Sequence, residues 1–202
     1  MQTTRTIFAL IAFAVLPCVT LSAQTAPAPA APKPIPGSIA SHPDWPVAKP
    51  DDVKSIDAIV AAVYDCISGP AGKARDWDRF RSLFVPDARL MPVRTPRPDG
   101  TGPRHNDISP FTVQDYIDRS SPAMLSTGFA ERGVANRVEA FGNIAHVWST
   151  YESRHDFKDE KPFARGINSI SLIKDGDRYW VVQILWDSER PGTTIPEKYL
   201  PK

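Results

Sequence analysis

Apolar side chains recur with helical spacing in two stretches of the first half of the chain, and a capping signal marks the start of a third helical stretch further on. In residues 53–68 they fall every three or four positions, at Val53, Ile56, Ile59, Val60, Val63 and Ile67. In residues 74–84 they form one stripe beside a polar face, made of Trp77, Phe80, Leu83 and Phe84. Residues 113–125 follow Thr112, with Asp115 at the spacing of a capping box. The pattern therefore predicts three helices.

Between the second and third helices the pattern changes twice. Residues 88–93 are typical of a short strand. Residues 95–110 are polar and contain several prolines and two glycines, so they are expected to form an irregular loop.

The last third of the chain consists of runs typical of β-strands. These are residues 128–141, 143–157 and 163–189, and the last of them contains an Asp175-Gly176-Asp177 turn that makes it a hairpin. Helices first and long antiparallel strands afterwards indicate an α+β fold. We expect the three N-terminal helices to pack on a strongly curved antiparallel sheet, forming a half-open cone with a pocket.

The hairpin turn allows two registers. A tight two-residue turn would pair Leu172 with Tyr179. A bulged turn would place Ile170 and Leu172 on the same face as Trp180, Val182, Ile184 and Trp186. We favour the bulged turn because it makes one continuous apolar face.

The favoured register assigns the two faces of the sheet. Asn168 lies on the inner face, where it contacts a ligand or is satisfied by the protein. Val181 and Leu185, with Trp148, lie on the outer face and predict a homodimer.

The two ends of the chain differ from this central domain, residues 51–190. Arg5, an apolar run over residues 7–19 and the small residue Ala23 are typical of a signal peptide spanning residues 1–23, the alternative being an uncleaved anchor. Residues 24–50 hold eight prolines and predict an extended linker. The tail, residues 191–202, contains three prolines and is expected to wrap the domain or to close the pocket mouth. We expect a periplasmic or secreted protein with no stable membrane insertion after signal cleavage.

Charge and ligand spacing exclude some classes of partner. The sequence has 24 basic and 23 acidic residues, whereas nucleic-acid or anionic-lipid binding favours a clear basic excess. No set of His, Asp and Glu shows the spacing of a metal site, so we expect neither a metal nor a cofactor.

The element order and two stretches of sequence resemble the nuclear-transport-factor-2-like (NTF2-like), or SnoaL-like, superfamily over residues 50–190. The stretches are YDCISGPAGKARDWDRFRSLFVPDARL and KDGDRYWVVQILWDSE. FGNIAHVWSTYES and RGINSISL are most similar to exported bacterial members of uncharacterised activity. The resemblance implies an α+β cone, a pocket between helices and sheet, and frequent homodimers formed through the outer sheet face.

The superfamily includes steroid isomerases, polyketide cyclases, scytalone dehydratase and limonene-epoxide hydrolase, which implies a carboxylate or histidine in an apolar pocket. In isomerase-like members the base follows the "DA" element, but Met91 and Pro92 stand there. The remaining candidates for an acid or base are His146, Glu131 and Asp187. The residues expected to line the pocket are Tyr64, Phe80, Tyr151, Asn168, Ile184 and Trp186.

Two functions are consistent with these candidates. The first is non-catalytic binding of a small hydrophobic molecule or a protein partner, because the sequence shows apolar walls without a complete acid–base pair. The second is a cofactor-free lyase, isomerase or hydrolase that acts on a hydrophobic small molecule. A titratable side chain deep in the pocket, within hydrogen-bond reach of another polar group, would favour the enzyme over the binding protein.

Overall fold

The computed structural model describes residues 35, 37–95 and 107–202, which belong to one compact unit. The predicted signal peptide, residues 1–23, lies outside the described residues. So do residues 24–34 of the predicted linker and most of the loop predicted over residues 95–110.

The first predicted helix is two helices, α1 (Pro50–Val53) and α2 (Ile56–Ile67). Ser55 interrupts them with an extended backbone (φ −148°, ψ 165°). The Ser55 hydroxyl oxygen accepts a hydrogen bond from the Ala58 N–H at 3.1 Å, which starts a new helix. The periodicity had predicted one helix because it does not register a cap inside an apolar pattern.

The second predicted helix is shorter than expected. Helix α3 (Trp77–Ser82) begins after Asp76, whose carboxylate accepts from the Arg79 N–H. The chain is already extended at the start of β1 (Phe84–Arg94), so this strand is longer than the predicted residues 88–93. The third helix, α4 (Val113–Thr127), has the predicted capping box between Thr112 and Asp115.

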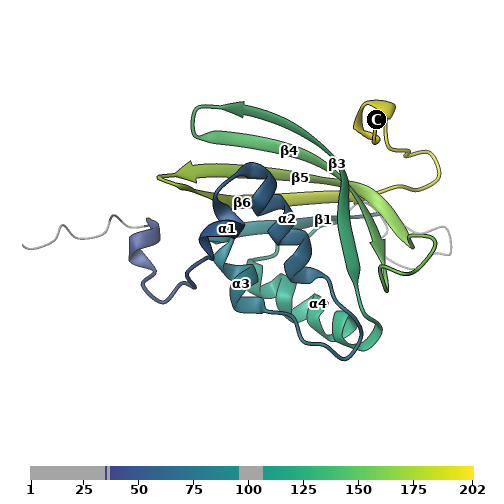
Figure 1. The fold of residues 1–202 in the computed structure, drawn as a ribbon, viewed down its shortest axis with the longest axis horizontal. Helices are drawn as coiled ribbons and strands as arrows, with labels where there is room; N and C mark the ends of the chain where they lie inside the picture. Colours follow the sequence, from purple (N-terminus) through teal and green to yellow (C-terminus); the bar gives the residue numbers. More distant parts are fainter. Residues whose placement is uncertain (1–34, 36, 96–106) are drawn as a thin grey trace, which may run out of the picture. The chain divides into compact units, whose positions relative to one another are not determined.

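The strands form one six-stranded sheet in the order β2-β1-β6-β5-β4-β3 (Figure 1). The remaining strands are β2 (Asp107–Ile108), β3 (Ala130–Phe141), β4 (Ile144–Arg154), β5 (Ala164–Asp175) and β6 (Arg178–Ser188). Neighbouring strands are antiparallel except β1 and β6, which are parallel. Strand β2 falls within the stretch predicted to be irregular, and it is only two residues long.

The β5–β6 register differs from the predicted one. The turn is tight, since Asp175 pairs with Arg178, and the irregularity lies further along, where Ser171 pairs with Gln183 but Leu172 pairs with Val181. Val182 is the extra residue of this bulge.

The bulge corrects the predicted faces of β6. Ile184 and Trp186 face inward as predicted, because they pair with Ile170 and Asn168. The prediction was wrong for Trp180 and Val182. Val181, expected on the outer face, is fully buried in the core.

The described part of the predicted linker packs on the domain. The indole Nε1 of Trp45 donates a hydrogen bond to the Phe84 carbonyl oxygen at 2.9 Å, and Ala48 is buried in the core. A short 3₁₀ turn, η1 (Ile39–Ser41), precedes them. The domain therefore begins before residue 51.

The tail packs on the face of the sheet away from the helices. The Thr150 hydroxyl donates to the Tyr199 carbonyl oxygen at 2.6 Å, and the rings of Trp148 and Tyr199 lie 5.5 Å apart. Ile195 is buried, and η2 (Glu197–Tyr199) is a single 3₁₀ turn. Of the two alternatives for the tail, the structure shows the one in which it wraps the domain.

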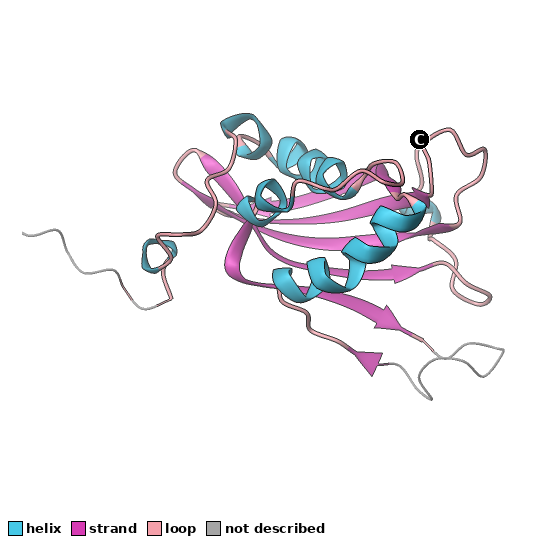
Figure 2. Cartoon of the chain, turned by 90° about the horizontal axis from the view of Figure 1, so that it is seen from below, coloured by secondary structure: helices cyan, strands magenta, loops and turns pink. Residues whose placement is uncertain are grey.

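The helices cover the other face of the sheet (Figure 2). Apolar side chains of α2, including Ile59 and Val63, pack with inward residues of the strands, including Val147 and Ile170, in one core. Thus the expected α+β architecture, helices on a curved and mainly antiparallel sheet, is confirmed. Within the described ranges no helix has the length and apolar character needed to cross a membrane.

Candidate functional site

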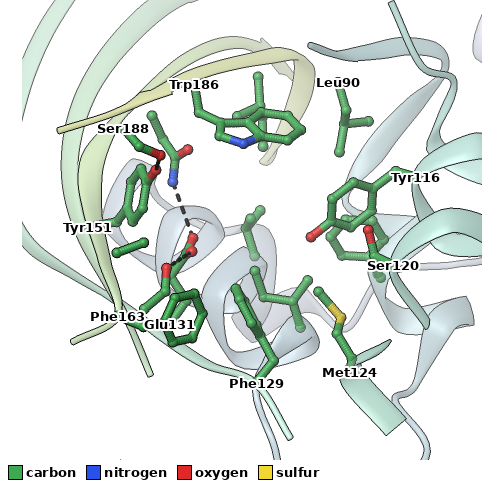
Figure 3. Close-up of a pocket in the computed structure, with 17 residues that line it drawn as sticks. Leu90, Tyr116, Ser120, Met124, Phe129, Glu131, Tyr151, Phe163, Trp186 and Ser188 are labelled. Atoms are coloured by element: carbon green, nitrogen blue, oxygen red, sulfur yellow. Dashed lines mark hydrogen bonds between the residues drawn. The ribbon is translucent and has the colours of Figure 1, made fainter. Parts of the chain in front are cut away.

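A cavity of about 280 Å³ lies between α2, α3, α4 and the inner face of the sheet (Figure 3). Its walls are mostly apolar, with contributions from Val63, Ile67, Phe80, Leu90, Met124, Phe129, Phe163, Ala164, Ile184 and Trp186. Its polar lining residues are Tyr116, Ser120, Glu131, Tyr151, Ser153, Asn168 and Ser188. An apolar cavity with a few convergent polar groups is the usual form of a small-molecule site.

Glu131 supplies the only carboxylate of this lining among the described residues. It lies near the start of β3 and pairs with Ser153 on β4, so both side chains point to the inner face. The Ser153 hydroxyl donates to Glu131 Oε2 at 2.6 Å, and Asn168 Nδ2 lies 3.4 Å from Oε1. The two contacts fix the carboxyl group inside the cavity.

Burial raises the pKa of Glu131 from its ordinary range to about 7. The hydrogen bonds from Ser153 and Asn168 lower the pKa of Glu131. They offset only part of the increase that the loss of hydration causes. No lysine or arginine is among the described residues that line the cavity, so no cation holds the carboxylate in its charged form. Glu131 is thus a titratable group with a pKa suited to proton transfer near neutral pH.

This raised pKa makes the stability of the protein depend on pH. Between the ordinary value of about 4.5 and about 7, the folded protein retains a proton that the unfolded chain has lost. The free energy of unfolding therefore falls as pH rises through this window. Compared with Glu131→Gln, the wild-type protein should lose about 3 kcal/mol more between pH 4.5 and 8 in urea unfolding. Equal losses in the two proteins would contradict the raised pKa.

Buried hydrogen bonds link Asn168, which contacts Glu131, to two further side chains. Asn168 Nδ2 also donates to the Tyr64 hydroxyl oxygen at 3.1 Å, and that hydroxyl lies 2.6 Å from Ser149 Oγ. Because the Asn168 amide nitrogen is the donor, the Tyr64 hydroxyl is free to donate to Ser149. Burial raises the pKa of Tyr64, so it remains a neutral hydroxyl. These hydrogen bonds orient Asn168 toward Glu131.

Tyr116 and Ser120 lie on α4, on the side of the cavity opposite Glu131, and the Tyr116 hydroxyl oxygen points into the cavity (Figure 3). They are one helical turn apart and therefore share a face. The Tyr116 ring is stacked on Phe80 at 5.5 Å and meets the edge of Trp186 at 6.1 Å. Burial, with a smaller contribution from the Glu131 charge, raises the pKa of Tyr116, so it also remains a hydrogen-bond donor.

Tyr151 closes the cavity on the sheet side. Its hydroxyl lies 2.8 Å from Ser188 Oγ, and burial raises its pKa to about 12. The Tyr151 ring lies across Gly166 of the paired strand, where a Cβ atom would come within 2.6 Å of the hydroxyl oxygen. Gly166 therefore makes room for Tyr151.

Five of the six predicted lining residues do line the cavity: Phe80, Tyr151, Asn168, Ile184 and Trp186. Tyr64 does not line the cavity. Its hydroxyl accepts a hydrogen bond from Asn168, and Asn168 is the residue that faces the cavity. Of the acid–base candidates, the structure brings only Glu131 into the cavity.

His146 and Asp187 were wrong as cavity acids or bases, because each sits on the outer face of its strand. His146 Nε2 lies 2.8 Å from Ser169 Oγ, and both residues alternate with inward neighbours. Asp187 pairs with Ile167 and accepts from Arg190 at 2.6 Å.

The sequence did not identify the hydroxyl groups of Tyr116 and Ser120 on α4. It also did not identify Ser153 and Ser188, which form hydrogen bonds with side chains of the sheet. The spacing of Tyr116 and Ser120 was a usable signal, since residues four apart share a helix face. Ser153 and Ser188 gave none, because their roles depend on the register between strands. On β1, Leu90 lines the cavity, so this strand presents an apolar side chain rather than a base.

No group of three or more possible metal-ligating residues occurs in the part of the chain that the structure describes.

Comparisons with known proteins find similar solved structures but no matching family model and no matching curated protein. A Nostoc punctiforme protein of unknown function with a cystatin-like fold has 12% identity and a TM-score of 0.48, covering 66% of this chain and 88% of its own. An NTF2-like protein of unknown function from Silicibacter pomeroyi has 12% identity and a TM-score of 0.44, covering 75% and 99%.

A candidate ketosteroid isomerase from Parabacteroides distasonis has 12% identity and a TM-score of 0.45, covering 69% of this chain and 92% of its own. The Silicibacter pomeroyi protein carries the NTF2-like description that the sequence resemblance named. Identities this low concern the fold alone. The roles of side chains therefore rest on the geometry of this chain.

Proposed function

We propose that the cavity binds a small, largely apolar molecule and that Glu131 transfers a proton to or from it, as in a cofactor-free isomerase or lyase. One observation supports this most directly: the Glu131 carboxyl group lies in an apolar cavity without a cation among its described lining residues. Burial there raises its pKa to about 7. A general base or acid works best with a pKa near the working pH. Both the charged and the neutral form of the Glu131 carboxyl group are then present near neutral pH.

The facing hydroxyls fit the same chemistry. Removing a proton next to a carbonyl or nitro group moves negative charge onto an oxygen of the substrate. Tyr116 and Ser120 lie across the cavity from Glu131 and can donate hydrogen bonds to such an oxygen. Donors that are already oriented stabilise this developing charge. The proposed substrate therefore has an acidic C–H bond close to an oxygen acceptor.

Non-catalytic binding, the first of the two functions predicted from the sequence, explains the cavity less well. Binding an apolar molecule requires apolar walls but no buried carboxyl group, and burial of such a group costs stability. The arrangement of Glu131 with Ser153 and Asn168 is accounted for if the carboxyl group takes part in a reaction. Ligand binding is then the first step of that reaction.

The proposal can be tested with 5-nitrobenzisoxazole, a small aromatic compound that opens to a coloured phenolate when a base removes its C–H proton. The wild-type protein should accelerate this opening, with a rate that rises with pH and has its midpoint near 7, because the charged carboxylate is the base. A rate no greater than that of acetate at the same concentration would contradict the proposal.

We infer further that the protein acts outside the cytoplasm, since residues 1–23 have the charge and apolar run of a signal peptide. Fractionation of cells that produce the full chain should find a protein shortened at its N-terminus in the periplasm or medium. Full-length protein in the cytoplasm would contradict export, and full-length protein in the membrane would favour an uncleaved anchor.

A further inference from the structure

Strand β3 forms one edge of the sheet, because it pairs with β4 on one side only. Its second half is exposed to solvent from Asn136 to Phe141. No backbone hydrogen bond from the tail or any other described segment covers this free edge. A long exposed edge is a template for pairing with another strand.

The regular part of this edge is bounded at both ends. On one side the pairing with β4 shifts between Gly133 and Ala135, and on the other β3 ends at Phe141 before the Gly142-Asn143 turn. Residues 135–141 therefore form an uninterrupted run of regular strand. The residue at its centre is Val138.

Two residues of opposite charge lie symmetrically about Val138, the centre of this run. Arg137 and Glu139 flank Val138, both are exposed, and neither forms an ion pair in the part of the chain that the structure describes. In an antiparallel pair of two β3 strands centred on Val138, Arg137 of each copy lies directly opposite Glu139 of the other. Registers centred on Arg137 or Glu139 would instead place like charges opposite one another, which is unfavourable.

Apolar side chains on the edge fit the same register. Val138 is 41% exposed and would lie opposite Val138 of the second copy. Phe141 is 85% exposed and would lie opposite Ala135, which is small enough to leave room for the ring. Ile144, 59% exposed, is the cross-strand partner of Phe141 on β4, so these two apolar side chains share the outer face. Val138 pairs with the buried Val147 and lies on the other face of the strand. Pairing would cover apolar surface on both faces of this edge that is otherwise in water.

We propose that two copies of this chain pair antiparallel through residues 135–141 of β3, with the two-fold axis at Val138, and so form one continuous sheet. This interface differs from the outer face expected from the sequence. There Trp148 already contacts Tyr199 of the tail, and Val181 is in the core. The tail runs beside residues 134–137, on the outer-face side of the edge.

The charge complementarity provides the test by sedimentation velocity from about 1 to about 100 µM. The wild-type protein should dimerise, whereas Arg137→Glu and Glu139→Arg should each weaken the dimer about tenfold or more, because two attractive pairs become repulsive. An equimolar mixture of the two variants should form a heterodimer, since one copy then presents two acidic side chains at this edge and the other presents two basic ones. The double variant Arg137→Glu/Glu139→Arg should associate like the wild-type protein.

Thermal unfolding of each variant, at a concentration low enough that the wild-type protein is monomeric, controls for folding. Exposed side chains on an edge should then leave the melting temperature nearly unchanged. A wild-type protein that is still monomeric at the highest concentration would overturn the proposal. So would single variants that dimerise as tightly as the wild-type protein, or a mixture that stays monomeric.

Discussion

The Glu131→Gln variant is expected to open 5-nitrobenzisoxazole about 10² to 10⁴ times more slowly than the wild-type protein at pH 8, the range typical of a lost general base. Glutamine has nearly the same shape and still accepts the hydrogen bond from Ser153, but it cannot take a proton. The cavity walls are unchanged, so binding of the neutral probe should persist. The loss should therefore appear in kcat much more than in KM.

A matched control lies on the same strand. Glu139 is exposed on the other face of β3, so Glu139→Gln should leave the rate unchanged. If both variants were equally active, the rate would come from outside the cavity and Glu131 would not be the base. Loss of the pH midpoint near 7 in Glu131→Gln, with the midpoint retained in Glu139→Gln, would identify the titrating group directly.

Gly166→Ala is expected to lower the free energy of unfolding by about 3 kcal/mol, at the upper end of overpacking effects. A Cβ atom there would overlap the Asp187 carbonyl oxygen and come within 2.6 Å of the Tyr151 hydroxyl. The carbonyl belongs to the backbone of the neighbouring strand, so side-chain rotation cannot relieve the overlap. In a chain of this size the melting temperature should fall by about 6 to 12 °C.

Gly133→Ala is a milder substitution of the same kind, with which the loss of stability in Gly166→Ala can be compared. Its Cβ atom would lie 3.0 Å from the Tyr64 ring and 3.1 Å from Ser149 Oγ, contacts that side chains can relieve by small shifts. We expect a loss of about 1 kcal/mol or less. Thermal unfolding followed by circular dichroism measures both variants, and equal losses would show that the crowding around Tyr151 is not what makes Gly166 necessary.

The architecture was predictable because the hydrophobic period changes clearly along the chain. Helical spacing in the first part and alternating strands in the last part located the elements. The errors arose where one residue overrides the period: Ser55 caps a helix within an apolar run, and Val182 bulges within a strand. A bulge reverses the faces on either side of it, which is why Trp180 and Val181 were assigned to the wrong faces.

The site was less predictable because it depends on register. Asn168, Ile184 and Trp186 were assigned correctly from alternation along the hairpin. Glu131 was one of three equal candidates, and only the pairing of Glu131 with Ser153 shows that it points inward. The contacts of Ser153, Ser188 and Tyr116 join elements distant in sequence, so no local pattern contains them.

The central claim is that Glu131 is a carboxyl group whose pKa is raised by burial in an apolar cavity. The most direct measurement is a ¹³C NMR titration of the glutamate side-chain carboxyl groups, with the Glu131→Gln variant used to assign the signal. We predict a midpoint near pH 7 for Glu131. A midpoint near 4.5, the ordinary value, would show a hydrated carboxylate and contradict the proposed role.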